Sequence, residues 1–175
     1  MIYVCLLRGI NVGGKNKVEM KKLKSEMLTN GFQNVVTYIN SGNIIFESEE
    51  TDILKLQGQI HDLIINVFDV DSKTLVISKE QFVEVAEMIP PHFKNDDEFK
   101  ADVLFYYQDM TQELIDTIPM KEGVDEAIYL KNAMIVGVSR KNQPKSGLIK
   151  IVGTKVYMHL TIRNVNTVRK IKELL

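Results

Sequence analysis

The segment Ile2–Leu7 constrains the fold most, because all six of its residues are apolar. A strand with one face in water would instead alternate apolar and polar residues. Continuous apolar runs of this length are typical of strands covered on both faces. We therefore expect a core strand whose sheet has helices on one face and the second half of the chain on the other.

The loop after this strand is rich in glycine and in basic residues. Gly9, four further residues, Gly14 and Lys15 match a phosphate-binding P-loop, but Asn16 stands where Ser or Thr should hold Mg²⁺. The pattern favours backbone N–H groups that face an anion at a helix N-terminus. The alternative is that the glycines only turn the chain, with Asn11 and Asn16 as turn and cap residues.

The first half shows the order β-α-β-β-α-β. Asn16 and Glu19 resemble a capping box, and Gly31 marks the end of the helix that follows. A second helix is expected to start at Thr51, with the clearest apolar period of the chain. The expected strands are 2–7, 32–39, 43–46 and 75–78, the middle two joined by a hairpin turn.

The second half repeats this order in outline. Ser78 and Gln81 resemble the capping pair of a third helix, and the polar run 94–100 resembles a linker. We predict an α+β fold of two ferredoxin-like (βαββαβ) subdomains packed together, with an extra C-terminal helix. The expected parts are subdomain 1 at 1–78, a connecting helix and linker at 79–100, and subdomain 2 at 101–175. Within 101–175 we expect strands at 103–107, 127–130, 133–138 and 160–162, and helices at 111–118, from about 146, and at the C-terminus.

Charge is segregated along a chain whose net charge is only −1. Residues 1–45 carry six basic and two acidic groups, residues 46–130 carry six and twenty, and residues 131–175 carry ten and one. If the two basic ends meet, they form a positive face that suits a phosphate, a polyanion or an acidic partner. The alternative is that the acidic middle simply pairs with the basic ends.

Cysteine and apolar content indicate a cytoplasmic protein. Cys5 is the only cysteine, so an internal disulfide is impossible and a reducing compartment is expected. No apolar run is long enough to cross a bilayer, so no membrane association is expected.

Two further polar clusters stand out. Asn40-Ser41-Gly42-Asn43 is the expected hairpin turn, and the sequence leaves open whether it shares a site with the first loop. In the segment 161–170, Asn164 can cap the last helix. Arg163 and Arg169 would then lie near the positive helix end, where they need an anion or a carboxylate.

No catalytic constellation is visible. The three histidines lack metal-ligand spacing to one another or to Cys5, and Cys5 lies in an apolar strand where it is expected to be inert. We therefore expect no cofactor, no metal and no catalytic residue. The aromatic signature of an RNA-recognition surface is also absent.

Three runs, LLRGINVGGKNK, GFQNVVTYINSGNIIFES and TIRNVNTVRKI, resemble the bacterial domain of unknown function 1697 (DUF1697) family. This resemblance extends nearly end to end, although the family typically has Trp at the position of Val165. It implies an α+β fold of ferredoxin-like pieces and no assigned catalytic residues. The residues that match the family's motifs are Arg8, Asn11, Gly13, Gly14, Asn40, Ser41, Gly42, Asn43, Arg163, Asn164, Asn166 and Thr167.

We therefore expect a non-catalytic module that binds a phosphate-containing small molecule or nucleic acid through its basic loop. The alternative is an enzyme that acts on a phosphorylated small molecule or a nucleotide. The candidate anion-site residues are Arg8, Asn11, Gly13, Gly14, Lys15, Asn40, Ser41, Asn43, Arg163, Asn164, Asn166 and Arg169.

Overall fold

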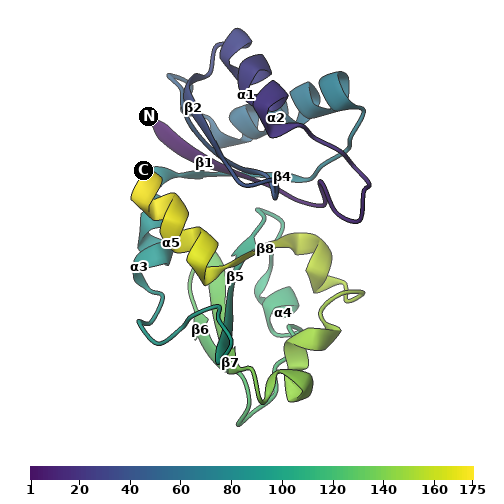
Figure 1. Cartoon of the computed structure of the whole chain (residues 1–175), viewed down its shortest axis with the longest axis vertical. Helices are drawn as coiled ribbons and strands as arrows, with labels where there is room; N and C mark the ends of the chain where they lie inside the picture. Colours follow the sequence, from purple (N-terminus) through teal and green to yellow (C-terminus); the bar gives the residue numbers. More distant parts are fainter. The chain divides into compact units, whose positions relative to one another are not determined.

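The computed structural model describes residues 1–175 and has a mixed α+β fold (Figure 1). Two four-stranded antiparallel sheets belong to two compact units. The first unit comprises Met1–Val83 and Ile171–Leu175, and the second comprises Glu84–Lys170. None of the helices has both the length and the apolar character that a membrane span requires.

The sheet of the first unit has the strand order β2-β3-β1-β4. Helices α1 (Met20–Thr29) and α2 (Ile53–Phe68) lie on the same face of this sheet (Figure 1). A hydrophobic core fills the layer between them. The strands are β1 (Ile2–Leu7), β2 (Gln33–Tyr38), β3 (Asn43–Glu47) and β4 (Thr74–Ser78).

Strand β1 is buried from Tyr3 to Leu7. Tyr3, Cys5 and Leu7 belong to the core beneath the helices, while Val4 and Leu6 have the opposite parity and are also fully buried. The expectation of a strand buried on both faces, drawn from its continuous apolar run, is therefore confirmed.

The helix caps differ in part from expectation. The capping box of Asn16 and Glu19 was wrong: α1 begins at Met20, and Glu19 makes no side-chain cap. Asn16 instead adopts a φ of 51°, and its Nδ2 donates to the carbonyl oxygen of Gly9 at 2.9 Å. The pair of Ser78 and Gln81 is confirmed, because each side-chain oxygen accepts from the other residue's backbone N–H at 3.3 Å.

The sheet of the second unit has the order β6-β7-β5-β8, which repeats that of the first. Its core forms between the sheet and a layer of short helical segments that Figure 1 shows on one side of β5 and β7. The strands are β5 (Phe99–Tyr106), β6 (Glu126–Tyr129), β7 (Ala133–Ser139) and β8 (Leu160–Asn164), and the first short helix is α4 (Gln112–Ile115).

The helix expected from about Ser146 was wrong. Three 3-10 segments occupy this region: η1 (Gln143–Lys145), η2 (Gly147–Lys150) and η3 (Val156–His159). The Ser146 hydroxyl accepts from the N–H of Leu148 and so caps the start of η2. Gly153, which lies between η2 and η3, has a φ of 95°.

Helices α3 (Lys79–Glu87) and α5 (Val165–Leu174) contain the points at which the chain passes between the units. Asn164 caps α5 as expected, because its Oδ1 accepts from the N–H of Thr167 at 2.9 Å. The Nζ of Lys79 donates to a backbone oxygen of Leu175 at 2.6 Å. The last residues of α5 therefore belong to the first unit.

Candidate functional site

The loop between β1 and α1 is a tight coil of left-handed turns. Gly9, Asn11, Gly13, Gly14 and Asn16 all have φ between 51° and 76°. Two of these five residues carry side chains, and asparagine is among the few such residues that tolerate this conformation. The left-handed backbone of this loop therefore explains why glycine and asparagine occupy these positions.

Asn11 fixes this loop. Its Nδ2 donates to the carbonyl oxygens of Val18 at 2.9 Å and Asn40 at 2.8 Å, and its Oδ1 accepts from the N–H of Val18 at 2.9 Å. The side chain thus joins the start of the loop to its end and to the β2–β3 turn. The sequence left open whether these two motifs meet, and the structure brings them together.

The loop differs from a P-loop in two respects. The N–H of Asn11 donates to Asn16 O and that of Lys15 to Val12 O, both at 3.0 Å, so these two donors are used within the loop. Helix α1 begins only at Met20, so the glycines do not lead directly into its N-terminus. Two of the backbone donors that a P-loop would direct at an anion are therefore used within the loop itself.

A shallow hollow of about 570 Å³ lies beside the loop. Lys17 and Lys21 line it and are exposed, and the exposed Lys15 is on the same loop. Glu19 is the one acidic residue in the lining. The candidate list from the sequence omitted Lys17 and Lys21, which a count of lysines around the Gly-Gly-Lys motif would have found.

The β2–β3 turn residues have structural duties. Asn43 is buried, and its Nδ2 donates to Tyr38 O and to Ser41 Oγ, both at 3.0 Å. Gly42 has a φ of 79°, and a Cβ at this position would lie 2.6 Å from the Cβ of Leu7. The turn is therefore shaped by its fit against β1.

The C-terminal cluster lies in the second unit, except that α5 continues into the first. Arg163 is buried and its Nη1 donates to Thr161 Oγ1 at 3.0 Å and to Ile162 O at 2.9 Å. We expected the Arg163 guanidinium to face an anion or a carboxylate. Two of its hydrogen bonds go instead to a hydroxyl and a backbone carbonyl.

Arg169 and Asn166 tie α5 to the segment after α3. Arg169 donates from Nη1 to Phe93 O at 2.6 Å and from Nη2 to Pro90 O at 2.9 Å. The Nδ2 of Asn166 donates to Asn95 O at 3.0 Å. Together with the cap by Asn164, these contacts give this motif a role in holding the 90–95 segment.

Comparisons with known proteins agree with the resemblance in the motifs. The sequence profile of a family described as "Protein of unknown function (DUF1697)" matches residues 1–135. No curated protein matches the chain. A solved structure, that of the conserved bacterial protein SP0830 from Streptococcus pneumoniae, is similar with a TM-score of 0.81 and 29% sequence identity.

The similarity to SP0830 covers 99% of this chain and 97% of that chain, so the fold of both units is shared. The profile match covers the whole first sheet with its loops, and β5, β6 and the start of β7 in the second sheet. The chain therefore belongs to the DUF1697 family.

Proposed function

We propose that the chain is a non-catalytic cytoplasmic module that binds a phosphate-bearing or other anionic ligand at its first loop. The observation that supports this most is the exposure of Lys15, Lys17 and Lys21 around a loop whose backbone Asn11 fixes. A fixed loop presents these charges without a large ordering cost when a ligand binds.

The geometry favours a weak, salt-sensitive site. The lysines are exposed and therefore interact with an anion through a medium close to water, which screens them. Glu19 in the hollow lowers the local positive charge further. If the natural ligand is a polynucleotide, its affinity will fall steeply with salt because bound counterions are released.

The test is a titration with inorganic pyrophosphate at low salt, followed by amide chemical shifts. We expect shifts confined to residues near the loop, and Lys15→Ala combined with Lys17→Ala should weaken binding. Lys24→Ala is the matched control, because Lys24 is exposed on α1 but does not line the hollow. If the double variant, the control and the wild type bind pyrophosphate with equal affinity, the proposal that the loop is an anion site is wrong.

We also infer that each unit is built on a ferredoxin-like subdomain, and we propose bounds of 1–78 for subdomain 1, 79–100 for a connector and 101–175 for subdomain 2. These bounds differ from those of the compact units, which divide α3 and assign Ile171–Leu175 to the first unit. The strand order supports this, since β2-β3-β1-β4 and β6-β7-β5-β8 place the first strand of each unit between the third and the fourth. Hydrogen exchange in increasing urea should reveal two cooperative blocks. A single block that spans both sheets would contradict two subdomains.

A further inference from the structure

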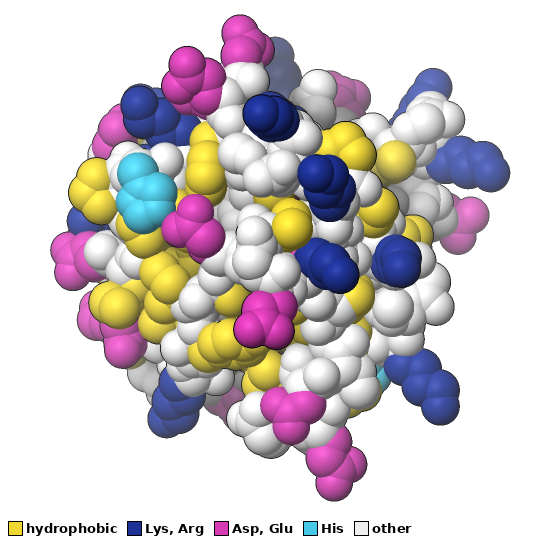
Figure 2. Space-filling model, turned by 90° about the horizontal axis from the view of Figure 1, so that it is seen from below, with side chains coloured by type: hydrophobic (Ala, Val, Ile, Leu, Met, Phe, Trp, Pro, Cys, Tyr) yellow, Lys and Arg dark blue, Asp and Glu magenta, His cyan; other side chains and the backbone are white.

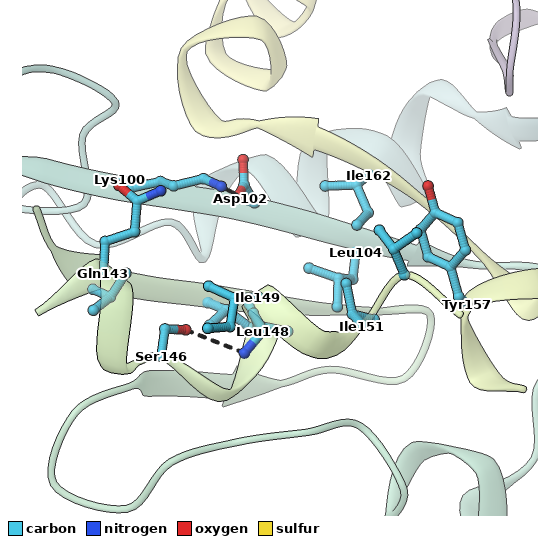
Figure 3. A pocket seen from close by; sticks show the side chains of 13 residues that line it. Lys100, Asp102, Leu104, Gln143, Ser146, Leu148, Ile149, Ile151, Tyr157 and Ile162 are labelled. Atoms are coloured by element: carbon cyan, nitrogen blue, oxygen red, sulfur yellow. Dashed lines mark hydrogen bonds and ion pairs between the residues drawn. The ribbon is translucent and has the colours of Figure 1, made fainter. Parts of the chain in front are cut away.

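The second unit contains a hollow of about 380 Å³ between its sheet and the 3-10 segments (Figure 3). The lining is mainly aliphatic and includes Leu104 on β5, Val136 on β7 and Ile162 on β8, with Ile151 from the segment after η2. This volume lies within the range of small-molecule sites, roughly 300–1,000 Å³. The hollow is thus large enough for a compact apolar group.

One end of the hollow holds an ion pair. The Nζ of Lys100 lies 3.5 Å from Oδ2 of Asp102, and Figure 3 shows the two side chains directed toward one another. Asp102 is the only acidic residue in the lining. Since its carboxylate already has a cation beside it, the hollow does not present a free negative charge.

The segment that covers the hollow is strongly basic. No aspartate or glutamate occurs between Glu126 and Glu173. Lys145 directly precedes the lining residue Ser146, and Lys150 lies between two further lining residues. The exposed lysines of this segment are Lys141, Lys145, Lys150 and Lys155.

Aliphatic side chains are exposed on the same segment. Ile149 and Val152 line the hollow, yet 57% and 71% of their surfaces are accessible to solvent. Figure 2 shows Lys and Arg side chains gathered beside hydrophobic ones on one face of the molecule. The stretch 145–152, which we call the mouth of the hollow, therefore combines exposed lysines with exposed aliphatic side chains.

We propose that this hollow binds a single-chain anionic amphiphile, with the alkyl chain against Leu104, Val136 and Ile162 and the anionic head group at Lys145 and Lys150. An apolar tail removes aliphatic surface from water, and the lysines of the mouth complement the head group. A cationic head would meet those lysines and Lys100. This site lies in the second unit and does not depend on the loop of the first.

Calorimetric titrations with monomeric hexanoate, octanoate and decanoate test the tail. Each added CH₂ group should tighten binding by about fourfold, until the hollow is filled. Decanoate should bind more tightly than decanol, and decanol more tightly than decylammonium. Binding that is independent of chain length, or decylammonium binding as tight as that of decanoate, would overturn the proposal.

Charge variants test the mouth. Lys145→Glu combined with Lys150→Glu should weaken decanoate binding by about threefold to tenfold, the range for two exposed charge contacts. Lys131→Glu is the matched control, because Lys131 is exposed in the β6–β7 turn and, unlike Lys145 and Lys150, is not next to a lining residue in the chain. Equal losses in the double variant and the control would overturn the head-group assignment.

A filling variant and a vesicle experiment complete the test. Ile162→Trp should block decanoate while the thermal melt confirms that the variant is folded; if it does not fold, the lysine variants decide. Phosphatidylglycerol vesicles distinguish a free amphiphile from a membrane surface. Binding to vesicles without binding of monomeric decanoate would assign the basic mouth to a membrane and overturn the proposal.

Discussion

At the scale of single residues, the polar motifs of this chain are used first to build its loops. The side chain of Asn11 makes three hydrogen bonds within the first unit, and Asn43 and Gly42 shape the turn that Asn11 contacts. Polar residues in a loop satisfy backbone groups that would otherwise lack partners, so such residues are not evidence of a ligand by themselves. The side chains of Lys15, Lys17 and Lys21 beside them are exposed and are not part of these hydrogen bonds.

Two glycines with positive φ are expected to respond differently to substitution. Gly42→Ala should destabilise the protein by about 2 kcal/mol or more, because the new Cβ adds a clash with Leu7 to the strain of a left-handed residue. Gly13→Ala should cost only about 1 kcal/mol, since no atom lies within 4 Å of its Cβ position. Urea unfolding measures both changes, and equal losses would show that backbone strain alone decides.

Asp102 is expected to make stability depend on pH. Burial raises the pKa of its carboxyl group, and nearby Lys100 opposes the shift only in part. Because the pKa of Asp102 is higher in the folded state, its protonation favours folding, and this contribution to stability is largest below the unfolded pKa of about 4. The contribution is lost as pH rises through the folded pKa. Asp102→Asn should therefore gain stability relative to the wild type as pH rises from about 4 toward neutrality.

Urea unfolding of wild type and Asp102→Asn across this pH range checks the sign. Asp97→Asn is the control, because Asp97 is exposed. If Asp102→Asn is less stable than the wild type at neutral pH, the ion pair with Lys100 outweighs the cost of burial.

At the scale of elements, α5 organises the chain around it. Its N-terminal half is capped by Asn164 and holds the 90–95 segment through Asn166 and Arg169. Arginine suits this task because its planar guanidinium can donate to two carbonyls at once. The segment 90–95 has no regular secondary structure, and Arg169 supplies hydrogen bonds to its carbonyls at Pro90 and Phe93.

Arg169→Met should release this segment. The loss of two charge-assisted hydrogen bonds is expected to cost about 2–3 kcal/mol and to raise amide hydrogen exchange in residues 90–95. Arg169→Lys should give an intermediate effect, because an ammonium group does not reproduce the fork. Lys141→Met removes an exposed charge of the same unit and should leave exchange there unchanged.

The elements also show what the sequence could predict. Strands β1, β3 and β4 followed from apolar runs because both of their faces are buried, and helix α2 followed from a clear helical period because one of its faces packs on the core. The segment 143–159 did not, since Ser146, Gly147 and Gly153 impose local turns that apolar spacing does not reveal. The contact of Asn11 with Asn40 joins residues 29 apart in the chain, and no local pattern encodes it.

At the scale of the whole molecule, the basic ends of the sequence are divided between the two units. The six basic residues before residue 46 belong to the first unit, whereas those from Lys131 to Lys170 belong to the second. The proposed loop site and the proposed hollow therefore draw on separate charges. A mutation that weakens binding at one site should leave binding at the other unchanged. Titration of each set of lysine variants with both pyrophosphate and decanoate measures this.

The first unit contains both Met1 and Leu175, and this arrangement has a mechanical consequence. A force applied between these two residues acts across the first unit alone for as long as Ile171–Leu175 stay attached to it. The second unit is an insertion along that path and bears load only after the attachment fails. In an optical trap, the first extension step should therefore come from the first unit, even if the second is the weaker in urea.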